Sequence, residues 1–236
     1  MAQHLPIKIG LSQRFQCSYI SDREEQLLVI LDPGCYSPQG FEALLKQGFR
    51  RSGEQIYRPH CPSCNACSSV RVLAKDFTPT RSQKRKLNKA KSYRVCISEK
   101  EKPEYFALYE RYINERHSDG TMYPPERSQY DSFLFCNWMH IHFIELWQRD
   151  KLIAVAVTDV MDNALSAIYT FFDPDYAHLS LGSVMIMKQI EHAQQTNKEY
   201  VYLGYQIDEC KKMRYKLQFQ PAQQLKNDHW IDVICL

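Results

Sequence analysis

The sequence predicts an α/β fold built from two mixed-sheet units in tandem, and three patterns lead to this expectation. Apolar runs of strand length are separated by short turn signals such as Arg149-Asp150 and Asp162-Asn163. Between some of these runs, apolar residues recur three and four positions apart, as they do on one face of a helix. A charged stretch that contains Pro103 divides the chain, so we expect one unit over residues 1–103 and another over residues 104–236.

The first unit is expected to combine strands with two helices. Residues 27–31 form an apolar run that ends at Asp-Pro-Gly, which indicates a short buried strand. A helix is expected from Ser37 to about Phe49, because apolar residues keep helical spacing there. Residues 69–73 alternate as a strand does, and the basic segment after Pro79 is expected to be helical.

The second unit opens with an amphipathic helix over residues 104–116, followed by a loop. Three strands, a helix and a last strand are then expected at residues 141–146, 152–160, 166–172, 182–196 and 200–205. This order resembles the acetyltransferase-like (GNAT-type) fold, in which the helix after the central strand directs its N-terminus at the phosphates of the acyl donor. The corresponding loop here contains Ser180 and Gly182, and the free N–H groups of a helix N-terminus attract an anion.

Composition is typical of an ordinary globular protein, with 44% hydrophobic and 24% charged residues. The longest strongly apolar run, residues 27–31, is far shorter than the ~20 residues of a membrane-spanning helix. The first residues mix polar and basic side chains with apolar ones and show no signal peptide. We therefore expect a cytoplasmic protein with no membrane partner and with its nine cysteines mostly reduced.

Positive charge is concentrated in two segments, although the formal net charge is only +3. Residues 81–94 hold seven basic residues and no acidic one, and residues 211–216 hold four basic residues. Such patches suit a partner that carries phosphates or carboxylates. The alternative is a solvated surface whose counter-charges lie elsewhere in the fold.

Three cysteines, Cys61, Cys64 and Cys67, have the spacing C-x2-C-x2-C. Thiolates at this spacing can converge on one soft metal ion, and Cys17 is the obvious fourth ligand. The hypothesis is a structural or regulatory Zn²⁺ ion or iron–sulfur cluster. The alternative is that these cysteines are free or structural thiols.

Several motifs, taken in their order along the chain, point to one family. They are GFRRSG (48–53), YRP (57–59), SQKR (82–85), SAIYTFFDPDY (166–176), SLG (180–182), YLGY (202–205) and CKKMRYK (210–216). Together they resemble the aminoacyl-tRNA–protein transferases of the N-degron pathway, from about residue 12 to about residue 225. Because the chain is compact, it is similar to the bacterial branch of that family, the aspartate/glutamate leucyltransferases.

This resemblance implies transfer of leucine from Leu-tRNA to proteins that begin with Asp or Glu, which gives them a destabilising N-terminus. The donor ester is already activated, so the transfer itself needs no cofactor, and the sequence contains no GxxxxGK[ST] motif. The resemblance also concerns the cysteines, because eukaryotic relatives can hold an iron–sulfur cluster in this region. In this chain Ile20 stands where the second cysteine of their first C-x-x-C pair is expected.

The transfer needs a proton acceptor for the attacking amine, donors to the developing oxyanion, and cations for a carboxylate and for phosphates. Asp173 is the candidate proton acceptor, unless Asp173-Pro174 merely ends a strand as a turn. The alternative is that the acceptor amine loses its proton to water or to the tRNA itself. Tyr205 and Tyr215 are the candidate catalytic hydroxyl groups. The candidate substrate-binding residues are Arg81, Lys84, Arg85, Lys89, Ser180, Gly182, Lys211, Lys212 and Lys216.

The two basic segments are expected to serve different substrates. A cation from the first segment is expected to bind the acceptor's side-chain carboxylate. The lysines of the second segment, with the helix N-terminus at Gly182, are expected to hold phosphates of the tRNA acceptor end.

Three alternatives stay open from the sequence. Arginine could be the donor amino acid in place of leucine. The C-terminal strand order also fits an acetyl-coenzyme A-dependent N-acetyltransferase, although a loop with the single glycine Gly182 counts against it. A non-catalytic tRNA-binding module would use the basic segments for salt-sensitive binding without transferring an amino acid.

Overall fold

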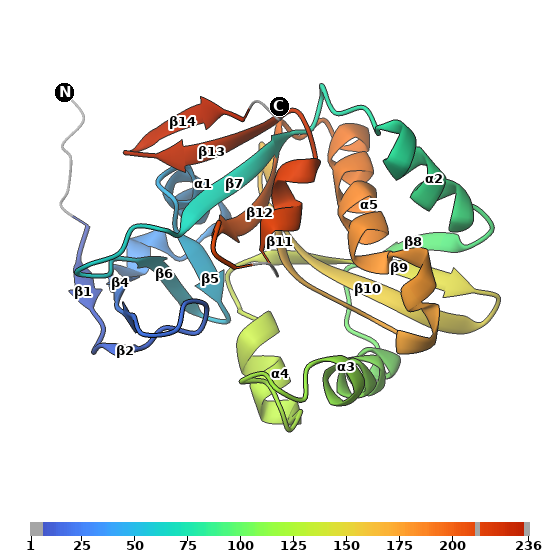
Figure 1. The fold of residues 1–236 in the computed structure, drawn as a ribbon, viewed down its shortest axis with the longest axis horizontal. Coiled ribbons are helices and arrows are strands. Elements are labelled where there is room, and N and C mark those ends of the chain that lie inside the picture. The colour runs from blue at the N-terminus through green and yellow to red at the C-terminus, as the bar shows by residue number, and fades with distance from the viewer. Residues whose placement is uncertain (1–6, 211–212, 234–236) are drawn as a thin grey trace.

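The computed structural model describes residues 7–210 and 213–233 and has a mixed α/β architecture (Figure 1). Within these residues the strands form three sheets. The eight-stranded sheet has the order β14 (His229–Asp232), β13 (Ala222–Lys226), β7 (Ser68–Leu73), β12 (Tyr200–Gln206), β11 (Ala164–Phe172), β10 (Lys151–Val160), β9 (His140–Gln148) and β8 (Arg94–Ser98). The smaller sheets are β1 (Ile9–Leu11), β4 (Leu27–Ile30), β6 (Gln55–Pro59) and β5 (Arg50–Ser52), and the pair β2 (Phe15–Gln16) and β3 (Glu24–Glu25).

Helices connect and cover these sheets. The α-helices are α1 (Pro38–Lys46), α2 (Arg81–Lys89), α3 (Pro103–Arg116), α4 (Arg127–Leu134) and α5 (Leu181–Gln195). Short 3-10 helices are η1 (Pro33–Cys35), η2 (Pro174–Leu179) and η3 (Arg214–Gln218). In the part of the chain that the structure describes, no helix has the length and apolar character needed to cross a membrane.

The centre of the large sheet is an antiparallel meander of β9, β10 and β11. Every residue of β10 from Leu152 to Asp159 is buried. A strand covered on both faces appears in a sequence as a continuous apolar run, and this run made β10 easy to predict. The structure confirms the three strands predicted here, and it also confirms the helix predicted at residues 182–196 and the strand at 200–205.

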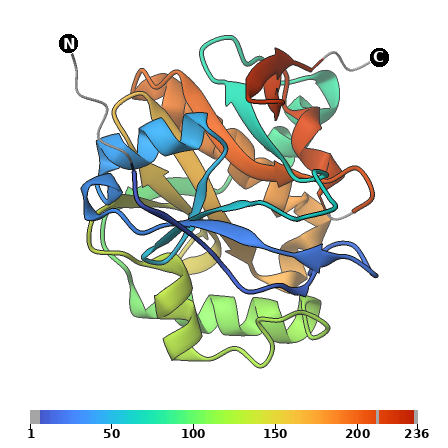
Figure 2. The same cartoon turned by 90° about the vertical axis from the view of Figure 1, so that its left-hand side faces the viewer.

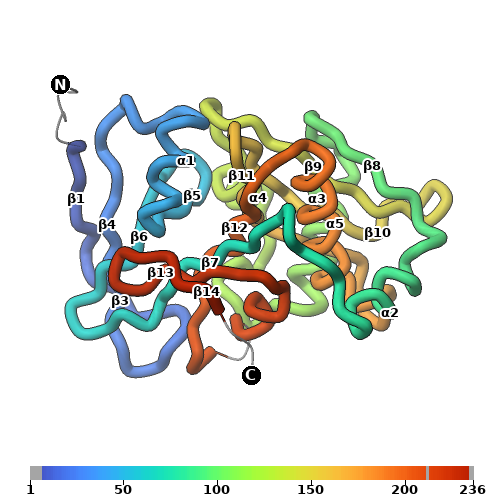
Figure 3. The backbone as a smooth tube through the Cα atoms, turned by 90° about the horizontal axis from the view of Figure 1, so that it is seen from above, coloured from blue at the N-terminus to red at the C-terminus, as the bar shows by residue number. Residues whose placement is uncertain are grey.

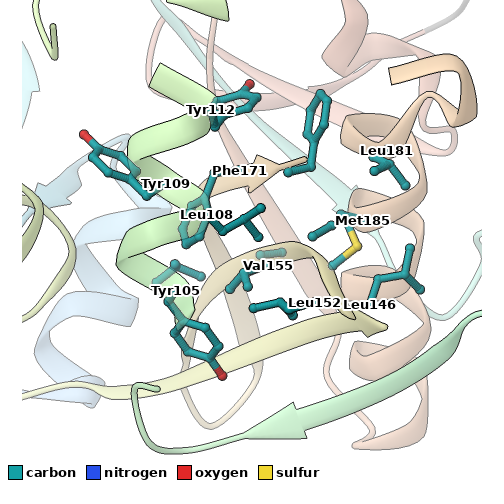
Figure 4. Packing of buried hydrophobic residues seen from close by; sticks show 14 of the residues in the cluster. Tyr105, Leu108, Tyr109, Tyr112, Leu146, Leu152, Val155, Phe171, Leu181 and Met185 are labelled. Atoms are coloured by element: carbon teal, nitrogen blue, oxygen red, sulfur yellow. The ribbon is translucent and has the colours of Figure 1, made fainter. Parts of the chain in front are cut away.

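Two helices enclose the buried side chains of the meander (Figure 4). From one side, Tyr105 and Tyr109 of α3 pack in the same cluster as Val155 and Phe171, with the rings of Tyr109 and Phe171 in edge contact. From the other side, α5 contributes Met185 to this cluster. Full burial of one such side chain contributes roughly 1.5–3 kcal/mol, so this layered core is a main source of stability.

The four-stranded sheet packs against α1 (Figure 2). The hydroxyl of Ser37 accepts a hydrogen bond from the Gly40 N–H at 3.1 Å, which caps the helix where the Ser-Pro pair predicts its start. Phe41 of α1 packs in a cluster with Ile56 of β6. The same cluster includes Tyr202 of β12, so the two sheets share buried contacts.

Strands from both sides of residue 103 share the large sheet. β7 pairs with β12 and with β13, and β8 pairs with β9, each in antiparallel register. Seen from above, β7 runs beside the β13–β14 hairpin, far along the chain (Figure 3). The structure therefore confirms a mixed α/β fold, but it does not confirm two tandem acetyltransferase-like units. The backbone groups of β7 and β8 find their partners in strands of the later part of the chain.

A buried ion pair joins the small sheet to the large one. Arg51 of β5 donates from Nε to Asp159 of β10 at 2.8 Å and from Nη2 to its other carboxylate oxygen, and both side chains are fully buried. Arg51 also donates to the backbone oxygens of Gly53 at 3.3 Å and Leu134 at 3.0 Å. Removing one member would leave an unpaired charge in the interior.

We predict that Asp159→Ala lowers the free energy of unfolding by about 3–5 kcal/mol, because it leaves the Arg51 charge buried without a counter-ion. The control is Asp131→Ala, which breaks the helix-surface pair of Arg127 and Asp131, whose side chains are 49% and 44% exposed. That loss should stay below about 1 kcal/mol. Urea unfolding of both variants measures the difference, and equal losses would contradict the role given to the buried pair.

Candidate active site

The parallel strands β11 and β12 are hydrogen-bonded only where they begin. Residues 164–166 pair with residues 200–202, and the described register does not continue beyond them. The pairing of β12 with β7 shifts between Tyr202 and Gly204, and Gly204 has a φ of +83°, a conformation that favours glycine. β12 therefore diverges from β11 in the middle of the sheet. Beyond this point the backbone N–H and C=O groups on the facing edges need hydrogen-bond partners other than each other.

Arg50 of β5 fills part of the opening between β11 and β12. Its Nη1 donates to Ser166 Oγ at 3.0 Å, and its Nη2 donates to the carbonyl oxygen of Ala167. Ala167 is the first residue of β11 beyond the paired segment, so the guanidinium takes the place of a neighbouring strand. Burial lowers the pKa of Arg50, but a guanidinium keeps its charge in a protein.

Lys216 of η3 enters the same opening from the side of β12. Its Nζ donates to the carbonyl oxygen of Tyr205 and lies 3.2 Å from Met213 Sδ. Burial, with a further contribution from the charge of Arg50, lowers the pKa of Lys216 to about 7. An amine with this pKa is partly unprotonated at neutral pH and can accept a proton. The sequence predicts a phosphate contact for Lys216, whereas the structure buries it in this opening.

Tyrosines surround these two cations. The hydroxyl of Tyr205 donates to the carbonyl oxygen of Gly48 at 2.9 Å, and Tyr57 pairs with Arg50 across β5 and β6. Tyr215, two-fifths exposed at 39%, lies near Tyr169 of β11. Burial raises the pKa of Tyr205 and of Tyr215, so both phenols keep their protons and act as hydrogen-bond donors.

A cavity of about 760 Å³ lies beside the opening. Tyr57 and Tyr205 form part of its lining, as do the β2–β3 hairpin and the turn between β13 and β14. The hydroxyl of Ser69, also in the lining, is buried and has no hydrogen-bond partner among the described residues. A buried polar group without a hydrogen-bond partner destabilises the fold. The Ser69 hydroxyl is therefore suited to form a hydrogen bond with a ligand in the cavity. The volume is in the usual range for binding sites.

The four cysteines predicted to hold a metal all line this cavity: Cys17, Cys61, Cys64 and Cys67. All four are free thiols. Cys64 Sγ accepts a hydrogen bond from Arg23 at 3.0 Å, and burial raises the pKa of Cys67 to about 12. In residues 7–210 and 213–233, no group of three or more Cys, His, Asp or Glu side chains is arranged to hold a metal ion. The arrangement does not fit a metal or cluster as it stands, and the metal site stays a prediction.

The basic helix α2 lies apart from the opening and beside the N-terminus of α5. Thr80 and Gln83 form a capping box that fixes the start of α2. The predicted cations of this helix, Arg81, Lys84, Arg85 and Lys89, are all exposed. Lys86 of the same helix contacts Ser183 Oγ of α5 at 3.2 Å, so the positive face of α2 adjoins the first turn of α5.

The first turn of α5 presents the two residues predicted from the loop. Ser180 is left-handed, with a φ of +57°, and no side chain caps the helix at this position. A Cβ on Gly182 would meet no atom within 4 Å, so the surface there is open. Free N–H groups, an open surface and adjacent cations together suit a phosphate. Of the remaining predicted cations, Lys211 and Lys212 lie outside the described residues.

Asp173 is almost fully buried at the end of β11, and both of its carboxylate oxygens are engaged. One oxygen binds Arg111 Nη1 at 2.8 Å and the Asp175 N–H at 3.0 Å, and the other binds Lys151 Nζ at 2.7 Å. These contacts fix the turn from β11 into η2. They favour a structural role for Asp173 over the predicted role as proton acceptor.

Sequence reasoning includes Arg50 in a family motif but assigns it no role in the site. A signal was present, because Arg50 and Arg51 are adjacent in a short strand and must point to opposite faces. Two charged side chains on opposite faces of one strand require two different partners. Their identity depends on strands more than a hundred residues later in the chain.

Two family models match most of the chain. Residues 15–85 match the model described as "Arginine-tRNA-protein transferase, N terminus", and residues 104–226 match the model described as "Arginine-tRNA-protein transferase, C terminus". A solved structure of FemX aligns with 80% of this chain and 79% of its own, at 8% identity and a TM-score of 0.45. That similarity is too low to bear on activity.

Curated relatives are similar over almost their whole length. An aspartate/glutamate leucyltransferase from Aeromonas hydrophila is 48% identical, covering 99% of this chain and 98% of the relative. One from Shewanella amazonensis is 50% identical, covering 95% and 94%. The family and the aminoacyl-transfer class predicted from the motifs are thereby confirmed. The chain belongs to the family of aminoacyl-tRNA–protein transferases that these two models describe.

Proposed function

We propose that this chain transfers leucine from Leu-tRNA to the N-terminal Asp or Glu of acceptor proteins, and that transfer takes place where β11 and β12 diverge. The names of relatives 46–50% identical over nearly the whole chain support leucine, rather than arginine, as the donor amino acid. The observation that carries the placement is the buried Lys216, with its pKa lowered to about 7, between the divergent strands. A proton acceptor is the group that this reaction requires from the protein.

The reaction is an acyl transfer from oxygen to nitrogen. The acceptor's α-amine attacks the carbonyl carbon of the leucyl ester, a C–N bond forms, and the C–O bond to the terminal ribose breaks. The attacking nitrogen gives up a proton to the unprotonated Lys216, and the departing ribose oxygen takes up a proton from the protonated Lys216 or from water. Tyr215, whose phenol stays protonated near the opening, is a suitable donor to the oxyanion that develops.

The tRNA is proposed to bind across α2 and the first turn of α5. The four exposed cations of α2 adjoin an open helix N-terminus, which suits the phosphates of the acceptor end. Gln83 Nε2 of α2 also donates to the carbonyl oxygen of Gln218 in η3 at 2.9 Å. The helix that contacts the tRNA is therefore attached to the element that carries Lys216.

The two parts of the chain are proposed to divide the work. Residues 1–103 supply Arg50, most of the cavity and the basic helix, and residues 104–236 supply Lys216, Tyr215 and α5. The acetyltransferase-like character is proposed for the second part, where the meander, α5 and the diverging β12 occur in that order. A cytoplasmic location is part of the same proposal, because both substrates are expected there.

The proposed activity is tested directly by incubating the protein with charged tRNA pools and with peptides that begin with Asp, Glu, Lys or Ala. We expect leucine on the Asp and Glu peptides, seen as a mass increase of one leucyl residue. Arginine on the same peptides would reassign the donor. Salt-sensitive tRNA binding without any product would favour a tRNA-binding module.

We predict that the single-turnover rate at saturating charged tRNA rises with pH through about 7. The folded pKa of Lys216 is about 7, so below it the amine is protonated and the rate should fall about tenfold per pH unit. Lys216→Met should remove this step and lower the rate at pH 7 by about 10²–10⁴-fold. The separate titration of the acceptor amine, near ~7.7–8.0, should persist. Lys46→Met, at an exposed lysine of α1, is the matched control and should keep both steps.

The same titration has a consequence for stability that does not depend on activity. Because the folded pKa of Lys216 lies below its usual 10.5, the unfolded chain binds more protons between about pH 7 and 10.5, and stability should rise with pH there. Besides Arg50, the groups that act on Lys216 are Cys67 and Cys210, which raise its pKa. Urea unfolding at several pH values should show a shallower rise for Lys216→Met. An unchanged rise would remove the basis for Lys216 as the proton acceptor.

We predict that replacing Lys84, Arg85 and Lys89 with Gln weakens binding of charged tRNA and reduces its salt dependence. Each lost phosphate contact should lower the slope of log K against log salt by about one. The KM for an acidic peptide should stay the same, because these side chains are exposed and apart from the opening. Arg14→Gln with Lys46→Gln, at exposed positions of the N-terminal part, is the control. A triple variant with the wild-type slope would place the tRNA elsewhere.

A further inference from the structure

Arg50 and Arg51 are neighbours in β5, but only Arg51 has a counter-ion. Arg51 pairs with Asp159, whereas Arg50 donates to the hydroxyl of Ser166 and to the backbone carbonyl of Ala167, both uncharged. Across the described residues, Arg50 forms no ion pair with a carboxylate. It is also buried, at 6% exposure. A permanent cation is therefore held in the interior with no carboxylate in direct contact, although the charge of Asp159 acts on it from a distance.

Such an arrangement is costly unless an anion joins it. The free-energy cost of moving an ion out of water is offset only by hydrogen bonds and by an opposite charge. The Tyr57 and Tyr205 phenols beside Arg50 cannot supply that charge, since burial raises the pKa of each. Lys216 adds an amine to the same opening as the Arg50 guanidinium, and the hydrogen-bond partners of Lys216 are also uncharged. The opening thus has the electrostatic character of an anion-binding subsite with no anion of its own.

The geometry brings the two side chains to one point. A Cβ on Gly204 would stand 3.7 Å from Arg50 Nε and 3.7 Å from Lys216 Nζ. The backbone of β12 therefore has the guanidinium and the amine close to the same small space. Tyr57 and Tyr205, which lie beside Arg50, also line the 760 Å³ cavity, so the cavity adjoins the residues that surround this space.

We propose that Arg50 determines acceptor specificity by binding the side-chain carboxylate of the N-terminal Asp or Glu, with the α-amine of the same residue at Lys216. This inference rests on the proposed leucyl transfer. An acidic N-terminal residue carries its carboxylate and its amine on one Cα, so binding one group positions the other for attack. A guanidinium can hold a carboxylate through two parallel N–H bonds. An Asn or Gln amide would fill the same space but leave the buried charge unneutralised.

Other cations of the cavity are less suitable for this role. Arg58 donates to the carbonyl oxygen of Gln47 at 2.9 Å and lies 3.6 Å from the carboxylate of Asp228. Arg23 is engaged with Cys64 Sγ, and Lys226, which also lines the cavity, is exposed to water. The cations of α2, from which the sequence predicts a carboxylate contact, are exposed to water, where an ion pair discriminates weakly. Burial makes Arg50 the cation that gains most from an acidic ligand.

The test compares four peptides that differ only in their first residue, Asp, Asn, Glu or Gln, with the full-length enzyme and Leu-tRNA. For Arg50→Met we expect kcat/KM for the Asp and Glu peptides to fall by about a hundredfold or more, as on removal of one partner of a buried charge pair. The Asn and Gln peptides should change little, so the preference for acid over amide should approach one. Binding of charged tRNA and the circular dichroism spectrum should match the wild type.

Two further variants keep the test decisive. Arg50→Lys retains a positive charge on a shorter side chain, so we expect a larger loss for Asp than for Glu, whose carboxylate reaches further. Arg58→Met, at an arginine that lines the cavity and pairs with Asp228, is the matched control and should keep the wild-type ratio of acid to amide. If Arg50→Met does not fold, Arg50→Lys decides: unchanged acid-to-amide and Asp-to-Glu ratios would overturn the inference.

The outcomes separate this inference from the proposed function. If the wild-type enzyme transfers leucine to no peptide, the proposed function itself is wrong. If the wild type prefers acidic peptides and a folded Arg50→Met variant keeps that preference, only the role of Arg50 is wrong. Loss of the preference in Arg58→Met but not in Arg50→Met would move the carboxylate to the mouth of the cavity.

Discussion

The buried ion pair between Arg51 and Asp159 fixes the small sheet against the large one, and the site depends on it. Because side chains alternate along a strand, anchoring Arg51 on one face of β5 directs Arg50 to the other face. That face meets β11 at the point where β12 leaves it. The ion pair thus decides which side chain enters the opening, although it touches no candidate substrate. Its burial makes the position rigid, since the pair cannot separate without exposing two charges to an apolar core.

The opening itself follows from the path of β12. A register shift and a glycine with positive φ turn β12 away from β11, and the backbone groups freed in this way bind Arg50 and Lys216 instead of each other. Hydrogen bonds to neutral oxygens orient both side chains but give the charge of Arg50 no paired counter-ion. The buried charge therefore lowers the stability of the fold in a region where a bound anionic ligand can raise it again. A loss of stability of this kind is common at functional sites, where the bound substrate supplies the missing interaction.

Local patterns were sufficient for the elements but not for the site. The strands of the meander, α5 and the start of α1 could be predicted from apolar periodicity and from Ser37-Pro38, because these signals are local. The sharing of one sheet by β7, β8 and the later strands could not, since it depends on pairings far apart in the sequence. Lys216 appeared as one of several cations in a basic segment, and nothing local showed that it is buried beside Arg50. Asp173 had the right position at the end of a strand, but Arg111 and Lys151, which occupy its oxygens, are distant in the sequence.

The position of the two charged regions has a consequence for how the substrates meet. Exposed cations on α2 can attract a tRNA over long distances, but water and salt weaken their power to discriminate. The buried guanidinium of Arg50 attracts little from afar, but in the proposed role it would distinguish a carboxylate from an amide strongly, because no carboxylate among the described residues pairs with it. Cations that attract the tRNA should therefore be exposed, whereas a cation that selects the acidic residue should be buried. Gln83 and η3 join these two environments, so in the proposed arrangement a tRNA held on α2 would present its ester near Lys216, close to the acceptor selected by Arg50.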